Sequence, residues 1–210
     1  MIRILLVCSA NICRSPYAEA LLLRALPAIS GLPSVAVSSA GTLARPGFPV
    51  CTTALAAVGA ASDTATVAAH VSRRIDAQMV AGSDLVLTAD SGHRGIASLL
   101  APSASARIFT LAEAAALTTV IGARGVRPAH DDTPEARFGA WVAALDAARG
   151  LALPVRLPGQ RMSRGERPGF DIADGHLQSR RRHLSALARV DSSMRAVTAS
   201  LASTMNASIM

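Results

Sequence analysis

Three residues near the start of the chain have the types and spacing of a covalent catalyst. Cys8, Arg14 and Ser15 lie within CSANICRS, residues 8–15. A thiolate is a strong nucleophile, a planar guanidinium can grip two oxygens of a phosphoryl group, and a nearby hydroxyl can donate to the sulfur. The alternative is a small buried thiol at a strand end and a solvated arginine at a helix start. A cysteine and an arginine at this spacing also recur by chance, so the surrounding elements must decide.

The flanking segments favour the catalytic interpretation. IRILLVC (2–8) is a continuous apolar run, as expected for a strand buried on both faces of a parallel sheet. PYAEALLLRAL (16–26) has helical periodicity, with Ser15 placed to be its N-cap and Pro16 its first residue. A loop between such a strand and helix directs N–H groups at an anion of phosphate size, and the helix dipole stabilises a thiolate at Cys8.

Further along the chain, predicted strands and helices alternate. The pattern indicates a parallel sheet with helices on both faces. The expected strands are 34–42, 84–88 and 107–111, and the expected helices are 49–59, 73–81, 90–100, 134–150 and a long amphipathic one at the C-terminus. In the helix at 134–150, four apolar residues share one face: Phe138, Trp141, Val142 and Leu145. The Pro-, Gly- and Arg-rich stretch 151–169 is expected to be an exposed loop.

Composition excludes several classes of protein. A chain of 210 residues fits one α/β domain, and none of its apolar runs reaches the length that crosses a bilayer. The net charge of +7 comes from arginines spread along the sequence, and with only 3% aromatic residues it favours anionic substrates over nucleic acid. Three cysteines without Cys-x-x-Cys spacing argue against a disulfide scaffold and a structural zinc site, and we expect no metal and a cytoplasmic protein.

Several segments of the sequence resemble those of one known protein family. CSANICRSP resembles the signature of low-molecular-weight protein-tyrosine phosphatases, and later blocks resemble that family in the same order: VSSAGT (37–42), AHVSRRI (69–75), SDLVLTADSGHR (83–94), RIFTLAEAA (107–115) and DIADG (171–175). The resemblance implies a three-layer α/β fold with a four-stranded parallel sheet of order 2-1-3-4. It also implies a single domain over 1–205, with an extended insertion at about 118–169.

The resemblance also assigns roles to residues. It implies that Cys8 is the nucleophile, Arg14 the phosphoryl-binding residue and Ser15 the residue that assists the sulfur. Asp174 would be the general acid and base, with Asp171 the weaker candidate. The phosphate-binding loop would comprise Ser9, Ala10, Asn11, Ile12, Cys13 and Arg14, and its supporting residues would be Asn11, Ser39 and His70. No metal and no organic cofactor are implied.

The sequence departs from the family pattern around the acid and in the loop. Gly175 replaces the proline after the acid, which predicts a looser loop, and His176 stands near where the family has a pocket aromatic, a role that Phe48 or Tyr17 could take. Ala10 replaces a glycine, a change that the loop should tolerate. Cys13 could form a protective disulfide with Cys8 on oxidation, or could simply be a packed thiol.

The predicted function is hydrolysis of phosphotyrosine in proteins through a phosphocysteine. By resemblance, the partner is a tyrosine-phosphorylated protein, such as a bacterial tyrosine kinase of polysaccharide export, and the protein is a monomer or weak homodimer. Three alternatives stay open. An arsenate reductase of this fold would need further resolving cysteines, and none follows Cys51. A protein-arginine phosphatase would carry threonine where Ile12 stands, and a binding module would trap phosphoproteins without turnover.

Overall fold

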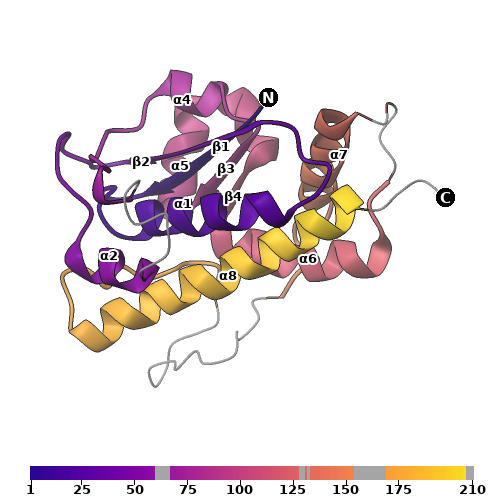
Figure 1. The fold of residues 1–210 in the computed structure, drawn as a ribbon. Helices are drawn as coiled ribbons and strands as arrows, with labels where there is room; N and C mark the ends of the chain where they lie inside the picture. Colours follow the sequence, from indigo (N-terminus) through magenta and orange to yellow (C-terminus); the bar gives the residue numbers. More distant parts are fainter. Residues whose placement is uncertain (60–66, 128–130, 132, 154–168, 207–210) are drawn as a thin grey trace.

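The sheet has the predicted order. In a computed structural model that describes residues 1–59, 67–127, 131, 133–153 and 169–206, four strands form one parallel sheet in the order β2-β1-β3-β4 (Figure 1). The strands are β1 (Ile2–Cys8), β2 (Val35–Gly41), β3 (Leu85–Thr88) and β4 (Ile108–Thr110). Because β1 pairs with β2 on one side and β3 on the other, its carboxyl end, where Cys8 lies, is central in the sheet.

Helices cover both faces of the sheet and make three layers (Figure 1). The α-helices are α1 (Arg14–Ala25), α2 (Thr52–Val58), α4 (Ala77–Ala81), α5 (Ser91–Leu100), α6 (Leu111–Arg124), α7 (Pro134–Ala147) and α8 (Arg180–Asn206), with 3-10 turns η1 (Leu26–Ala28) and η2 (Pro102–Arg107). Helices α4 and α5 pack on one face, and α1, α2, α6, α7 and α8 pack on the other. The three-layer architecture is therefore confirmed.

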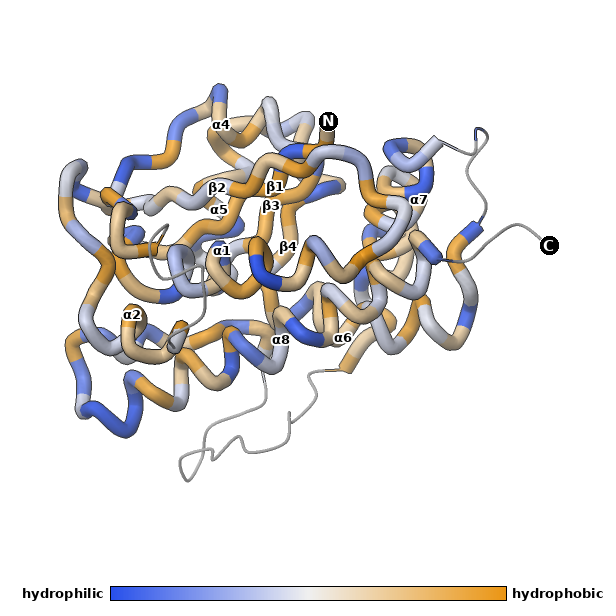
Figure 2. The backbone as a smooth tube through the Cα atoms, viewed as in Figure 1, coloured by the Kyte–Doolittle hydropathy of each residue, from blue (hydrophilic) through white to orange (hydrophobic). Residues whose placement is uncertain are grey.

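The core follows the alternation of side chains along β1. Leu5 and Val7 pack with Val80 and Ala97 on one face of the sheet, whereas Leu6 belongs to the larger cluster on the opposite face. In Figure 2 the central strands are coloured mainly as hydrophobic, and the start of α8 mainly as hydrophilic. A shift of β1 by one residue would exchange the side chains of its two buried faces and disrupt the packing of both clusters, which fixes the position of Cys8.

Helix α6 was not predicted. The sequence indicated a strand over 107–111, but the strand ends at Thr110, whose side chain caps the new helix in a reciprocal capping box with Glu113. The buried residues of α6 run without a break from Leu111 to Thr118, so its first two turns are buried on every side and have no periodic stripe. Periodicity alone cannot distinguish such a helix from other buried segments.

The described part of the expected insertion packs on the final helix. The four apolar residues predicted to share a face of α7 are all buried, and Trp141 donates a hydrogen bond from its ring N–H to Ser200 of α8 at 3.1 Å. The rest of the expected loop at 151–169 lies mostly outside the described residues. Within the part of the chain that is described, no helix is both long and apolar enough to cross a bilayer.

Candidate active site

The carbonyl groups of the loop between β1 and α1 accept hydrogen bonds from backbone N–H groups of other segments. The carbonyl of Cys8 accepts from the N–H of Thr42 at 2.9 Å, and the carbonyl of Ser9 accepts from Leu43 at 2.8 Å. The Ile12 carbonyl accepts from Cys51 at 2.7 Å. Among the described residues, the backbone N–H groups from Ser9 to Cys13 have no acceptor. The loop therefore has its N–H groups free for an anion, at the start of a helix, as the sequence predicted.

Asn11 gives the loop its shape. Its φ of 55° is the left-handed conformation that asparagine tolerates better than most residues. Its side chain is fully buried, donates to Ser15 at 3.0 Å and to Ser39 at 2.8 Å, and accepts from the N–H of Arg73 at 2.9 Å. Ala10 is not among the described residues with positive φ, so the loop tolerates alanine there without backbone strain.

The predicted supporting residues meet around Asn11. Ser39 donates to Glu19 at 2.6 Å, and the Nε2 atom of His70 lies 2.8 Å from the carbonyl oxygen of Asn11. The sequence analysis missed Glu19 and Arg73, although Arg73 lies in the quoted block at 69–75. Arg73 bonds the loop with its backbone N–H and the Ser39 carbonyl with its side chain at 2.8 Å.

Gly41 at the end of β2 allows the loop to approach the sheet. A Cβ atom on Gly41 would lie 2.5 Å from the carbonyl oxygen of Ser9 and 2.8 Å from the amide nitrogen of Asn11. Both are backbone atoms that cannot move aside without displacing the loop. The glycine of the SSAGT block is thus required by close packing against the predicted site.

Cys8 and Ser15 are in direct contact. The Cys8 sulfur lies 3.1 Å from the Ser15 hydroxyl, and both side chains are buried. The prediction of Ser15 as the N-cap was wrong, because α1 begins at Arg14 and Cys13 is the N-cap residue. The hydroxyl is therefore not used for capping. Because Asn11 already donates to the Ser15 oxygen, the hydroxyl proton is available to the Cys8 sulfur or the more distant carbonyl of Ala40 at 3.4 Å.

The guanidinium of Arg14 is buried and fixed at the mouth of the loop. The residue is 2% exposed, and its NH1 atom donates to the Ile172 carbonyl at 2.8 Å. Its NH2 atom donates to the Ser9 hydroxyl at 3.0 Å and to Asp174 at 2.8 Å. A cation held by several contacts loses little entropy when an anion arrives, so the site is preorganised for a phosphoryl group.

Asp174, and not Asp171, faces Arg14. The Asp171 carboxylate accepts from the N–H of Ser91 at 2.7 Å and from its hydroxyl at 2.9 Å. These bonds tie residues 169–179, which carry the predicted acid and are called the acid-bearing segment below, to α5. Asp174 is half exposed, ion-paired with Arg14 and capped by the N–H of His176 at 2.9 Å. The structure thus brings the predicted acid to the loop and gives the weaker candidate another role.

Gly175 is in tight contact with the start of α8. A Cβ atom there would lie 2.6 Å from the Cα atom of His183 and 2.7 Å from the carbonyl oxygen of Arg182. Any other residue, including the proline that the family pattern has here, would push the segment away from the helix. The close packing supplies a constraint that the sequence analysis did not foresee when it predicted a looser loop.

A second acidic residue at the mouth of the loop was also missed. Asp90 caps α5, lies 2.9 Å from the Nδ1 atom of His93 and 3.4 Å from Arg14. The other ring nitrogen of His93 lies 2.9 Å from the Ser9 hydroxyl. Burial alone would raise the pKa of Asp90, but hydrogen bonds from His93 and the charges of His93 and Arg14 outweigh it, so the pKa lies below the ordinary value.

The Cys13 side chain contacts α8 and Cys51. Its sulfur lies 2.8 Å from the Nε2 atom of His183, and a hydrogen bond to Cys51 raises the pKa of the Cys13 thiol, as does burial. The same hydrogen bond lowers the pKa of Cys51 to about 5, because the Cys13 thiol as donor stabilises the Cys51 thiolate. All three cysteines are free thiols, and a disulfide between Cys8 and Cys13 stays a prediction.

The aromatic candidates for a substrate pocket differ in exposure. Tyr17 is only 6% exposed and belongs to the core, so it is not available as a pocket wall. Phe48 is 52% exposed and lies on the segment that follows Leu43, which is bonded to the loop. Ile12 is partly buried against the core, within the loop itself. Phe48 is thus the accessible one of the two predicted aromatics.

Known proteins resemble the chain in sequence and fold. A sequence model described as "Low molecular weight phosphotyrosine protein phosphatase" matches residues 3–118. The "Probable low molecular weight protein-tyrosine-phosphatase EpsP" of Ralstonia nicotianae is 33% identical over 110 residues, which is 52% of this chain and 70% of that protein. A protein-arginine-phosphatase of Geobacillus stearothermophilus is 35% identical over 109 residues, 52% of this chain and 68% of that one.

Solved structures extend the likeness over nearly the whole chain. Vibrio vulnificus Wzb, determined in complex with benzylphosphonate, superposes with a TM-score of 0.57 at 21% identity, covering 94% of this chain and 97% of its own. At that identity the likeness shows the fold alone. Together with the family match over more than half of the sequence, it leads to one assignment. The chain belongs to the low molecular weight protein-tyrosine-phosphatase family.

Proposed function

We propose that the protein hydrolyses phosphotyrosine in proteins through a covalent phosphocysteine on Cys8. The observation that supports this most strongly is the contact of the Cys8 sulfur with the Ser15 hydroxyl at 3.1 Å, inside a loop whose N–H groups have no acceptor among the described residues. A serine in this position can donate to the thiolate that attacks and to the thiolate that leaves. A buried structural cysteine would gain nothing from it.

The first step transfers the phosphoryl group to sulfur. The Cys8 thiolate attacks phosphorus, the phosphorus–oxygen bond to the aryl group breaks, and Asp174 gives its proton to the leaving phenolate. Arg14 and the loop N–H groups stabilise the equatorial oxygens. Because Asp174 is ion-paired with Arg14 at 2.8 Å, arriving phosphoryl oxygens compete for the guanidinium and displace the carboxylate, which takes up a proton from solvent and then faces the leaving oxygen.

The second step restores the thiol group as a thiolate. Asp174, now a carboxylate, accepts a proton from water as that water attacks phosphorus, and the sulfur–phosphorus bond breaks. Inorganic phosphate leaves, and Ser15 again donates to the sulfur. No step requires a group that the chain does not supply.

The substrate class is the finer part of the proposal. Relatives in the family are named both as tyrosine and as arginine phosphatases. The bulk of Ile12, where the resemblance implies threonine in arginine phosphatases, favours an aryl phosphate. The same resemblance suggests a tyrosine kinase of polysaccharide export as the partner. A catalytic thiol must stay reduced, which favours the cytoplasm.

The test is hydrolysis of para-nitrophenyl phosphate near pH 6 and of phosphotyrosine and phosphoarginine peptides by the wild type, Cys8→Ser and Ile12→Thr. We expect wild-type activity on both aryl phosphates, none with Cys8→Ser, and a shift toward phosphoarginine with Ile12→Thr. A preference of the wild type for phosphoarginine would assign the other family activity. A wild type that binds vanadate tightly but hydrolyses neither peptide would show a phosphoprotein-binding module instead.

A further inference from the structure

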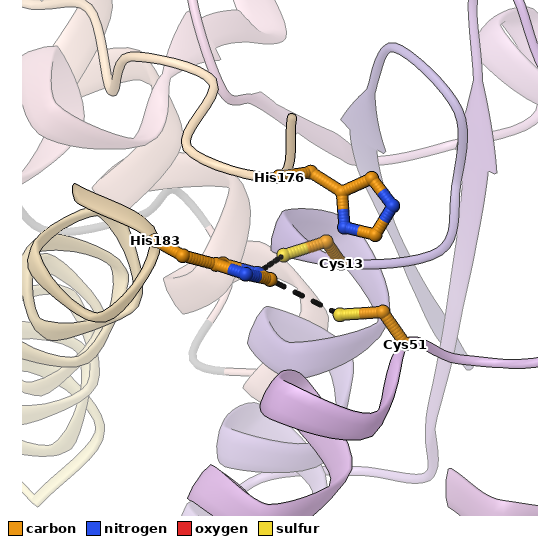
Figure 3. Close-up of side chains that lie close together, drawn as sticks. All are labelled: Cys13, Cys51, His176 and His183. Atoms are coloured by element: carbon orange, nitrogen blue, oxygen red, sulfur yellow. Dashed lines mark hydrogen bonds between the residues drawn. The ribbon is translucent and has the colours of Figure 1, made fainter. Parts of the chain in front are cut away.

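Four side chains of metal-binding type meet on the outer side of the phosphate loop. Cys13 ends the loop, Cys51 is the N-cap residue of α2, His176 follows the acid-bearing segment, and His183 lies in the first turns of α8 (Figure 3). One ligand atom from each, two sulfurs and two ring nitrogens, lies within 4.8 Å of every other. Segments far apart in the sequence therefore converge on one small volume.

The contacts centre on the Nε2 atom of His183. It lies 2.8 Å from the Cys13 sulfur and 3.6 Å from the Cys51 sulfur, as the dashed lines in Figure 3 indicate. The His176 ring stands edge-on to the His183 ring, with centroids 5.4 Å apart and an interplanar angle of 89°. The hydrogen bonds between the two thiols and this imidazole nitrogen are weak, because sulfur is a weak hydrogen-bonding partner.

His176 supplies an independent observation. Its Nδ1 atom is buried and has no hydrogen-bond partner among the described residues. In Figure 3 one nitrogen of the His176 ring is turned toward Cys13 and His183. A buried, unpaired ring nitrogen is costly unless it binds something, and a metal ion would satisfy it.

We propose that Cys13, Cys51, His176 and His183 bind one Zn²⁺ ion in a tetrahedral site. Zinc takes sulfur at about 2.3 Å and imidazole nitrogen at about 2.0–2.1 Å, so its ligand atoms lie roughly 3.3–3.8 Å apart. The widest separations, up to 4.8 Å, need a contraction of about 1 Å to reach that geometry, whereas the 2.8 Å contact between Cys13 and His183 needs to widen by less than that. Any proton still on either sulfur goes to solvent as that sulfur binds the ion as a thiolate.

The ligand set favours zinc and a structural role. Two thiolates and two imidazoles match the preference of Zn²⁺, whereas calcium and magnesium prefer oxygen. Four protein ligands leave no open position for water, which is the pattern of a structural site. The sequence analysis expected no metal because Cys-x-x-Cys spacing is absent, but here the ligands come from separate segments that only the fold brings together.

The ion would hold the acid-bearing segment against the phosphate loop. His176 is two residues from Asp174, and Cys13 precedes Arg14. Zinc would thus constrain the same segment that lacks the family's proline. The binding site stands without the proposed function, and only this positioning effect rests on it.

The experiment is a titration of reduced, metal-free full-length protein with Co²⁺, followed by displacement with Zn²⁺. We expect one Co²⁺ per chain, visible absorption of tetrahedral cobalt, near-ultraviolet thiolate-to-cobalt charge transfer, and loss of both on adding Zn²⁺. Zn²⁺ should also raise the thermal unfolding temperature, because it binds the folded state. Absence of the charge-transfer band would overturn the proposal.

Variants locate the ion. Cys51→Ser and His176→Ala should each weaken binding by more than the roughly 10–100-fold that outer-shell partners of a metal contribute. Cys8→Ser should leave the cobalt spectrum unchanged, and Leu177→Ala, at an exposed neighbouring residue, is the matched control for His176→Ala. A charge-transfer band that is lost in Cys8→Ser and retained in Cys51→Ser would place the metal on the proposed nucleophile and contradict the site.

Wild-type Co²⁺ affinity in His176→Ala, a variant in a segment outside the core helices, would also contradict the site. These outcomes need no substrate, so they are independent of the phosphatase test.

Discussion

The phosphate loop and the acid-bearing segment are built in opposite ways. Residues 8–15 are contiguous, so one short motif carries the proposed nucleophile, the arginine and the serine. The segment 169–179 is positioned by distant partners: Asp171 bonds Ser91, Ile172 bonds Ala89, and Asp174 bonds Arg14. A contiguous motif can be recognised in the sequence of any relative, because its residues stay next to one another. A segment positioned by tertiary contacts can carry different residues when the residues that it contacts differ too.

The comparison is tested most strongly at Asp174. Asp174→Asn should lower kcat for phosphotyrosine by roughly 10²–10⁴, because the amide cannot supply the proton that the phenolate needs. The loss in kcat/KM, which reports the first step alone, should shrink for substrates with acidic leaving groups, which depart without a proton. Steady-state kinetics over a series of aryl phosphates measures both effects.

Asp171→Asn is the matched control for that variant. Asparagine keeps an oxygen that can accept from the Ser91 N–H, so activity should stay within about tenfold of the wild type. If the two variants lose activity equally for every leaving group, Asp174 is not the proton donor.

Within the phosphate loop, Asn11 should be the most sensitive supporting residue. Asn11→Ala removes three buried side-chain hydrogen bonds and leaves a residue with a Cβ at φ 55°, which should cost about 3 kcal/mol of unfolding free energy. Urea unfolding measures it. Asn11→Gly removes the same bonds without the backbone strain and should be about 1 kcal/mol more stable than Asn11→Ala. Equal stabilities of the two variants would show that the φ value is not a constraint.

In the acid-bearing segment, the matching position is Gly175. Gly175→Ala should destabilise the protein by about 1–3 kcal/mol, because its Cβ would overlap the backbone of α8. Gly95→Ala is the control, since a Cβ on Gly95 in α5 meets nothing within 4 Å, and alanine there should stabilise the helix slightly. If Gly175→Ala instead increases both stability and activity, the segment is loose, as the sequence alone suggested.

The smallest effect concerns Asp90, which joins the two regions. Because its folded pKa lies below the ordinary value of 3.8, its charge stabilises the folded state at pH values above that value, and the contribution is lost as pH falls through the folded pKa. Asp90→Asn keeps an N-cap oxygen but removes the charge. The difference in unfolding free energy between wild type and Asp90→Asn should be larger at pH 5 than below about pH 4. A difference that does not change with pH would mean that the charge contributes nothing.

What the sequence predicted follows the same division. The sheet order and the placement of Cys8, Arg14, Ser15 and Asp174 around one loop were predicted, because strand, loop and helix signals are local and the family motifs are specific. Helix α6 was missed, because its first two turns are buried on all sides and show no periodic apolar stripe. The N-cap at Ser15 was misassigned, since the serine hydroxyl has a tertiary partner in Cys8.

The remaining residues could not be found from spacing. Glu19 and Arg73 support the loop through contacts with residues 20 and 62 positions away, to Ser39 and Asn11 respectively. His93 bonds Ser9 across 84 positions. Nothing near these residues in the sequence marks them, although Arg73 and His93 both lie within blocks that resemble the family.

The central claim is that Cys8 carries the phosphoryl group during turnover. The most direct measurement is intact-mass and peptide-mapping analysis of acid-quenched Asp174→Asn during hydrolysis of para-nitrophenyl phosphate, where the variant should slow the hydrolysis step that needs a base. We predict a single added phosphoryl group on Cys8 that is absent from the Cys8→Ser protein. Turnover without an adduct, or an adduct on another residue while Cys8 stays unmodified, would contradict the account.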